Sequence, residues 1–87
     1  MWYVYILQCS DSSYYTGMTN NIQKRLDRHN KGNGAVYTRL RRPTELVYSE
    51  ELHSKGEALR RELEIKKLKR KNKERLVNFA PLVTGFK

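Results

Sequence analysis

The hydrophobic positions near the start of the chain follow a two-residue period. The segment Trp2–Gln8 would place its even-numbered side chains on one face of a strand and its odd-numbered side chains on the other, with one face on a core. A second β-prone segment, Tyr14–Thr19, follows the polar stretch Cys9–Ser13, and this arrangement is typical of a β-hairpin. If the pairing is centred on the middle of that stretch, Tyr5 and Tyr15 stand on the same face.

The hydrophobic period then changes to that of a helix. The first helical turn has Thr19 or Asn20 as candidate N-caps, and the glycine-containing segment 31–34 ends the helix. The side chains that recur at helical spacing are Ile22, Leu26 and His29. On a helical wheel Arg25 lies on the flank next to His29, so both can lean toward the sheet.

The middle of the chain is basic and then strand-like. Residues 35–44 form a basic connection that ends in Arg41-Arg42-Pro43-Thr44, where the proline blocks a helix. The segment Leu46–Ser49 predicts a third strand, and the acidic pair Glu50-Glu51 marks its end.

A capping box at Ser54–Glu57 opens a long helix in the last third of the chain. The apolar arc predicted for this helix consists of Ala58, Leu59, Leu63, Ile65 and Leu68. Glu62 falls inside this arc. A carboxylate on an apolar helix face is unfavourable unless it has a partner or a function. The apolar residues of 76–79 predict a last short helix. We therefore expect one domain over residues 1–80 and a C-terminal tail over 81–87.

The order strand, strand, helix, strand, helix, helix predicts an α+β fold, with a small and mainly antiparallel three-stranded sheet flanked by helices. A length of 87 residues allows one domain with a modest core. Because 31% of the residues are charged, we expect little apolar surface beyond one sheet face and the helix stripes that face it.

The charge is strongly positive and unevenly distributed. Eighteen Lys and Arg against nine Asp and Glu give a net charge of +9. Two segments carry most of the excess: Lys24–Arg42 has seven cations and one acid, and Lys55–Arg75 has ten cations and four acids. This pattern favours a polyanionic partner, most simply nucleic acid, over the alternative of solvated helix faces, which interleave acids more evenly.

Composition also bounds the compartment and the chemistry. The single cysteine, Cys9, excludes an internal disulfide and fits a reducing compartment, and no signal peptide or membrane span is apparent, so we expect a cytoplasmic protein without a membrane partner. No Cys or His cluster has zinc-ligand spacing, and neither a glycine-rich phosphate loop nor a G-x-S-x-G motif occurs.

Five landmarks in order carry a resemblance to a known family. They are Tyr3-Val4-Tyr5, Tyr15-Thr16-Gly17, a helix with Lys24-Arg25-Leu26 and His29, the run Gly34-Ala35-Val36-Tyr37-Thr38-Arg39, and Ala58-Leu59-x-x-Glu62. Over about the whole chain this pattern resembles the GIY-YIG nuclease superfamily, and most of all its small single-domain members. The resemblance implies an α+β fold with Tyr5, Tyr15, Arg25, His29 and Glu62 together on one face of the sheet.

In this family Glu62 would be the single protein ligand of a Mg²⁺ or Mn²⁺ ion that keeps water and phosphate oxygens as its other ligands. The alternative is a glutamate that pairs with Arg61 or Lys66 on the same helix. Arg25 would bind the scissile phosphate through its guanidinium fork, and the alternative is an exposed helix cation.

His29 could orient or activate water, since its ordinary pKa of about 6.5 allows it to accept a proton at neutral pH. Its alternative is a packed histidine on an apolar face. The resemblance makes Tyr5 the candidate base or a water-orienting hydroxyl, and Tyr15 a second phosphate or water contact. A cation would have to lower the tyrosine pKa for this purpose, and the alternative for both rings is core packing.

The function that follows from the resemblance is a metal-dependent endonuclease acting on DNA, including branched or damaged DNA, in DNA repair. The alternative is a nucleic-acid-binding module with the same fold and no cleavage activity. The expected nucleic-acid contacts are Lys24, Arg28, Tyr37, Thr38, Arg39, Arg41, Arg42, Lys66, Lys67, Lys69 and Arg70.

Overall fold

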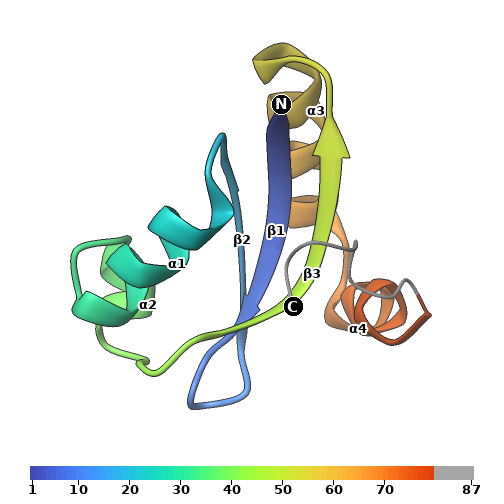
Figure 1. The fold of residues 1–87 in the computed structure, drawn as a ribbon. Helices are drawn as coiled ribbons and strands as arrows, with labels where there is room; N and C mark the ends of the chain where they lie inside the picture. Colours follow the sequence, from blue (N-terminus) through green and yellow to red (C-terminus); the bar gives the residue numbers. More distant parts are fainter. Residues whose placement is uncertain (80–87) are drawn as a thin grey trace.

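Three antiparallel strands and four helices make up residues 1–79, the part of the chain that the computed structural model describes. The elements in order are β1 (Trp2–Gln8), β2 (Tyr14–Thr19), α1 (Ile22–Lys31), α2 (Val36–Arg39), β3 (Glu45–Leu52), α3 (Lys55–Lys67) and α4 (Arg70–Phe79). The predicted α+β fold with a three-stranded antiparallel sheet is therefore confirmed (Figure 1). The predicted tail, residues 81–87, lies outside the described residues.

The strand order is β2-β1-β3, so β1 is central and β2 is an edge strand. Tyr5 pairs with Gly17 and Leu7 pairs with Tyr15, which centres the hairpin on the middle of the Cys9–Ser13 turn. Opposite residues of an antiparallel pair share a face. The prediction that Tyr5 and Tyr15 lie on the same face is confirmed.

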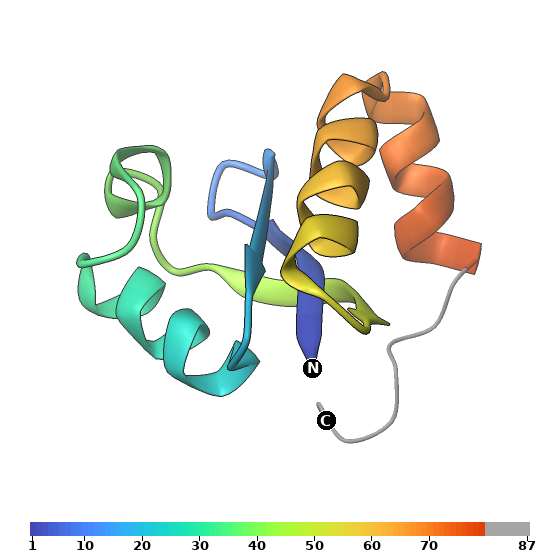
Figure 2. The same ribbon diagram turned by 90° about the horizontal axis from the view of Figure 1, so that it is seen from above.

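Both faces of the sheet are covered, and the expectation that only one face meets a core is wrong. Side chains 4–7 of β1 are all buried. Figure 2 shows α1 and α2 on one side of the sheet and α3 and α4 on the other. The odd-numbered residues of β1 are themselves apolar or aromatic, and they pack against Ile22 and Leu26 of α1. A central strand with apolar side chains on both faces requires a helix on each side.

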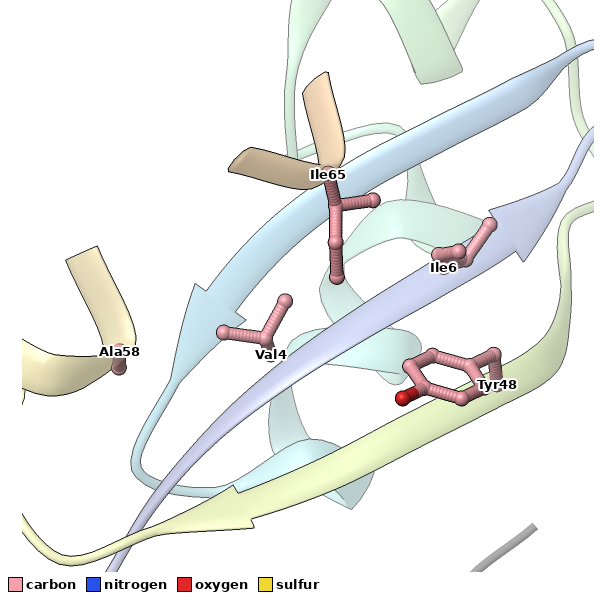
Figure 3. Packing of buried hydrophobic residues seen from close by; sticks show 5 residues of the cluster. All are labelled: Val4, Ile6, Tyr48, Ala58 and Ile65. Carbon is pink, nitrogen blue, oxygen red and sulfur yellow. The ribbon is translucent and has the colours of Figure 1, made fainter. Parts of the chain in front are cut away.

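The core beneath α3 is formed by the even-numbered face of β1. Val4 and Ile6 pack there with Tyr48 of β3 and with Ala58 and Ile65 of α3 (Figure 3). Only one side of α3 is used, because Leu59 and Leu63 are each 48% exposed. The predicted apolar arc is therefore wrong for these two leucines, since the helix faces the sheet with the stripe that runs through residues 58, 62 and 65.

Three boundaries differ from the sequence predictions. The N-cap of α1 is Asn21, whose side chain accepts a hydrogen bond from the Lys24 amide at 3.0 Å. Within the connection 35–44, the residues Val36–Arg39 form the short helix α2. The last helix, α4, begins at Arg70, well before the apolar residues that predicted it.

Strand β3 extends to Leu52, past the acidic pair that was expected to end it. Glu50 is retained in the strand because its carboxylate accepts a hydrogen bond from Arg61 Nε at 2.7 Å and another from the Tyr48 hydroxyl. The contact with Arg61 joins β3 to α3. The capping box is confirmed, with Ser54 Oγ accepting from the Glu57 amide at 3.2 Å. None of the helices between residues 1 and 79 combines the length and apolar character of a bilayer crossing.

Candidate active site

The hairpin places two tyrosines around a glycine that has room for no side chain. A Cβ at Gly17 would lie 2.5 Å from the Tyr5 hydroxyl and 3.2 Å from the Tyr15 ring. The Tyr5 ring therefore extends from β1 over the one position of β2 that carries no side chain. Because β2 is the edge strand and lies between α1 and α3 (Figure 2), the hydroxyl of Tyr5 is brought to the margin of the sheet.

His29 of α1 meets the Tyr5 hydroxyl at this margin. Its side chain is 1% exposed, and its Nε2 lies 3.0 Å from the Tyr5 hydroxyl oxygen. The other ring nitrogen, Nδ1, lies 2.7 Å from the hydroxyl oxygen of Thr38 in α2. The Tyr15 ring packs edge-on against the imidazole with centroids 5.1 Å apart. The expected meeting of Tyr5, Tyr15 and His29 is thus present in the structure.

The imidazole of His29 is neutral at pH 7. Burial, together with the nearby positive charges of Arg25 and Arg28, lowers its pKa from 6.5 to about 4. A neutral imidazole has one ring nitrogen that donates and one that accepts a hydrogen bond. One ring nitrogen of His29 is therefore available to accept a hydrogen bond from a neighbouring group.

Both site tyrosines are held in the protonated form. Burial raises the pKa of Tyr5, the Tyr15 hydroxyl and the Glu62 carboxylate raise it further, and Arg25 lowers it. Burial also raises the pKa of Tyr15, again with a lowering effect of Arg25 and a raising effect of Glu62. Arg25 is thus the cation that was expected to lower the tyrosine pKa values, but its effect is smaller than the rise that burial causes. These shifts show that Arg25 and Glu62 act electrostatically on the same two hydroxyls.

Arg25 is half-buried on the flank of α1, and no carboxylate within residues 1–79 forms an ion pair with it. It lines a polar pocket of about 160 Å³ together with Lys24 and Arg28. The rest of the lining is Thr19, Asn20 and Asn21. An unpaired guanidinium in a pocket without acids is suited to bind a phosphate.

Glu62 approaches the tyrosines from the opposite side of the sheet. It lies on the buried stripe of α3 between Ala58 and Ile65, and its side chain is 13% exposed. Its partner on the helix is Lys66, whose Nζ lies 3.8 Å from Glu62 Oε2, whereas Arg61 pairs with Glu50 and Glu64. The expected intrahelical pair with Lys66 thus exists, but at a distance that leaves the carboxylate open to another cation.

The donor set around Glu62 fits a hard divalent ion that keeps most of its water. Within residues 1–79 no three His, Cys, Asp or Glu side chains form a metal cluster. A single carboxylate near the Tyr5 and Tyr15 hydroxyls supplies oxygen donors only, as Mg²⁺ and Mn²⁺ prefer. Glu62 would be the one charged protein ligand of such an ion.

The predicted nucleic-acid contacts divide into surface groups and structural groups. Tyr37 is 38% exposed and stacks on Tyr15 with ring centroids 6.1 Å apart. It lines a groove of about 200 Å³ together with Lys66. The remaining lining residues are Tyr14, Tyr15, Thr16 and Lys73, the last of which was not among the predicted contacts. Lys67 and Lys69 are exposed.

Several other basic residues of this set are already bound within the fold. Arg41 Nε donates to Asp11 at 3.0 Å and its guanidinium lies over the Tyr37 ring. Arg42 donates to the backbone carbonyl of Arg39, a residue whose own side chain is exposed. Arg70 lies over the Tyr14 ring and donates to the Ser12 carbonyl at 2.8 Å. These side chains secure loops as well as adding positive charge.

Thr38 takes a different place from the one that the sequence suggested. Its side chain is fully buried and its hydroxyl contacts His29, so it lies behind the site and away from the surface. Gly34 packs directly on the His29 ring, since a Cβ there would lie 2.3 Å from Nδ1. Both residues belong to the run 34–39 that carried the resemblance, but its sequence gave no sign of contact with the histidine.

Comparison with known proteins agrees with this geometry. A family model described as the GIY-YIG catalytic domain matches residues 1–75. The chain belongs to the GIY-YIG family. The family consists of nucleases that generally use divalent metals, so a nuclease-type function and nucleic-acid binding are indicated for this chain.

Its relatives are small proteins of the same length class. It is 50% identical over 76 residues to the UPF0213 protein of Staphylococcus saprophyticus, covering 87% of this chain and 93% of the relative. It is 53% identical over 75 residues to a UPF0213 protein of Natronomonas pharaonis, covering 86% and 88%. The solution structure of the UPF0213 protein BH0048 from Bacillus halodurans is similar, with a TM-score of 0.61, 48% identity, and coverage of 93% of this chain and 87% of that one.

Proposed function

We propose that this GIY-YIG protein is a metal-dependent endonuclease that hydrolyses phosphodiester bonds in DNA. The observation that carries the proposal is the meeting of the Tyr5–His29 hydrogen bond with the charges of Arg25 and Glu62. Hydrolysis of a phosphodiester requires a base for water, positive charge for the transition state and assistance to the leaving oxygen. Tyr5 and His29 are candidates for the base, Arg25 supplies positive charge, and Glu62 supplies a ligand for the metal ion that would assist the leaving oxygen.

Each side chain has a role that its surroundings support. Tyr5 and His29 would together accept the proton of the attacking water, because the neutral imidazole lies 3.0 Å from the hydroxyl. Arg25 would bind the scissile phosphate, since its charge acts on both tyrosine hydroxyls and no carboxylate within residues 1–79 pairs with it. Glu62 would hold Mg²⁺ or Mn²⁺, and a bound divalent ion supplies Lewis acidity and neutralises charge on the phosphate. Tyr15 would contact a phosphate oxygen or the water.

DNA is the proposed substrate because the exposed cations surround the site on two sides. The pocket beside α1 contains three cations and no acid, and the groove beside α3 and α4 contains Lys66 and Lys73 next to three aromatic rings. More specifically, we propose that the substrate is branched or damaged DNA and that the protein acts in DNA repair in the cytoplasm.

A nucleic-acid-binding module without cleavage activity is the second candidate. The observation that favours it is the raised pKa of Tyr5, which keeps the hydroxyl protonated at neutral pH in the absence of metal. In that case the surface cations would act alone, and the residues at the margin of β2 would serve stability.

The deciding experiment is incubation of the pure protein with duplex, flapped, branched and single-stranded DNAs in Mg²⁺, Mn²⁺ or chelator. We expect cleavage of at least one DNA that requires metal and is lost in Glu62→Gln. The matched control is Glu64→Gln on the same helix. It makes the same carboxylate-to-amide change at an exposed position and should cleave as the wild type does. Binding without cleavage for every DNA and metal would favour the second candidate.

A further inference from the structure

The loop before α2 and the helix itself form a cradle for His29. The backbone of Gly34 lies against the ring, and the buried hydroxyl of Thr38 lies 2.7 Å from Nδ1. The same hydroxyl lies 3.1 Å from the carbonyl oxygen of Ala35. The direction of each of these hydrogen bonds is restricted, because a carbonyl oxygen can only accept a hydrogen bond and a hydroxyl has a single proton to donate.

The Thr38 hydroxyl donates its proton to the Ala35 carbonyl, so it must accept at its oxygen from His29 Nδ1–H. A neutral imidazole that carries its proton on Nδ1 has a free lone pair on Nε2. The Tyr5 hydroxyl then donates to Nε2 over 3.0 Å. All three hydrogens along the line from Tyr5 to Ala35 have an acceptor.

The opposite tautomer fits less well. With the proton on Nε2, His29 would donate to the Tyr5 oxygen, and Thr38 would donate to Nδ1. Within residues 1–79 the Tyr5 hydroxyl has no hydrogen-bond partner besides His29, so its own proton would be left without an acceptor inside the fold. An unsatisfied hydroxyl at 3% exposure is costly.

We propose that Thr38 is a positioning residue that fixes His29 as the Nδ1–H tautomer and so turns the Nε2 lone pair toward Tyr5. The catalytic part of this inference rests on the proposed nuclease function. When water attacks the phosphate, the Tyr5 oxygen takes a proton from the water while the hydroxyl proton of Tyr5 passes to His29 Nε2. The imidazole becomes imidazolium, and the Nδ1–H bond to Thr38 stays in place throughout.

The tautomer can be measured without any cleavage. In long-range ¹H–¹⁵N spectra of the full chain at neutral pH, we expect Nδ1 of His29 to be protonated and Nε2 to be bare. The chain has two histidines, and exposed His53 serves as the internal reference. A wild-type spectrum with the proton on Nε2 of His29 would overturn the proposal, even if the protein cleaves DNA. A protein that cleaves nothing but has the Nδ1–H tautomer would refute the nuclease function and keep the hydrogen-bond assignment.

Variants separate positioning from stability. Thr38→Val keeps the shape and removes the hydroxyl; we expect loss of the single tautomer and a fall in kcat of about 10- to 100-fold with KM little changed, as for other partners that orient a functional histidine. Thr38→Ser should restore both. The matched control is Thr44→Val, which removes another buried hydroxyl, bonded to Asn30 at 3.0 Å, and should leave both readouts unchanged. Wild-type kcat and tautomer in folded Thr38→Val would contradict the proposal.

Discussion

The substitution Gly17→Ala tests how the site is built, because it adds a single methyl group beside the Tyr5 hydroxyl. The added Cβ would lie 2.5 Å from the hydroxyl oxygen and 2.7 Å from Cζ of the same ring. Ordinary contacts between such atoms are about 3.5 Å or longer. The end of the Tyr5 ring must therefore move by about 1 Å, and the hydrogen bond to His29 moves with it.

Two effects on stability oppose each other in this variant. Insertion of a methyl group into a packed site typically costs about 1–3 kcal/mol. Alanine in a strand is favoured over glycine by about 0.5–1 kcal/mol, and Gly17 has an ordinary extended backbone that alanine can adopt. The free energy of unfolding should thus fall by about 1–2 kcal/mol, and the chain should remain folded.

The effect on cleavage should be larger than the effect on stability. A displacement of about 1 Å at a catalytic group can reduce a rate by about 100-fold. We expect Gly17→Ala to bind DNA as the wild type does without metal and to lose about two orders of magnitude in cleavage rate. The assays are urea denaturation and single-turnover cleavage of the best DNA from the panel.

The matched control is Gly56→Ala in the first turn of α3. A Cβ there would meet only Ser54 Oγ at 4.0 Å. This variant should keep full activity and gain a few tenths of a kcal/mol or more, because alanine is the better helix former. If Gly17→Ala cleaves at the wild-type rate, the position of the Tyr5 hydroxyl does not matter for catalysis, and the assignment of Tyr5 as part of the base is refuted.

Three further predictions follow from the same site and surface. Tyr5→Phe removes only the hydroxyl and its hydrogen bond to His29, so it should lower the cleavage rate by about 100-fold or more while the free energy of unfolding falls by about 1–3 kcal/mol; an unchanged rate would exclude Tyr5 as a base. Burial and the neighbouring arginines lower the pKa of His29 from 6.5 to about 4, so between these pH values the unfolded chain binds a proton that the folded chain does not bind. The contribution of His29 to the free energy of unfolding should therefore be complete above pH 6.5 and fall by about 3 kcal/mol toward pH 4. Subtraction of the His29→Gln curve isolates this effect, and parallel curves would contradict the lowered pKa. The double variant Lys67→Ala/Lys69→Ala should reduce the slope of log affinity against log salt by about two if both exposed lysines meet phosphates, and an unchanged slope would remove them from the DNA surface.

The sequence was sufficient for the hairpin and for the body of the first helix because their signals are local. Alternation in Trp2–Gln8 and the central turn determined the register of the hairpin, and helical spacing placed His29 and Arg25 on the side of α1 that faces the sheet. Helix α2 could not be predicted in this way. It has four residues, which is about one turn, and too short a segment to display a helical period.

The errors in α3 have a different origin. Leu59 and Leu63 look like core residues on a helical wheel, but a wheel does not say which stripe meets the sheet. That choice depends on partners from elsewhere in the chain, namely Val4, Ile6 and the Glu50 carboxylate that binds Arg61. The strand β3 was predicted too short for the same reason, since the charge of Glu50 is compensated by a helix that follows it.

The position of β2 explains how charged residues from two sides of the sheet affect the same Tyr5 hydroxyl. Tyr5 lies on the face covered by α1, whereas α3 packs on the opposite face, so the expectation that all five residues share one face is wrong for Glu62. The two faces meet where the sheet ends, at β2, and Gly17 leaves space there for the Tyr5 ring. The carboxylate of Glu62 therefore raises the pKa of the Tyr5 hydroxyl across the edge of the sheet. An edge strand with a glycine opposite Tyr5 is thus a geometric requirement of the proposed site, and this is why a single methyl group at Gly17 should separate folding from cleavage.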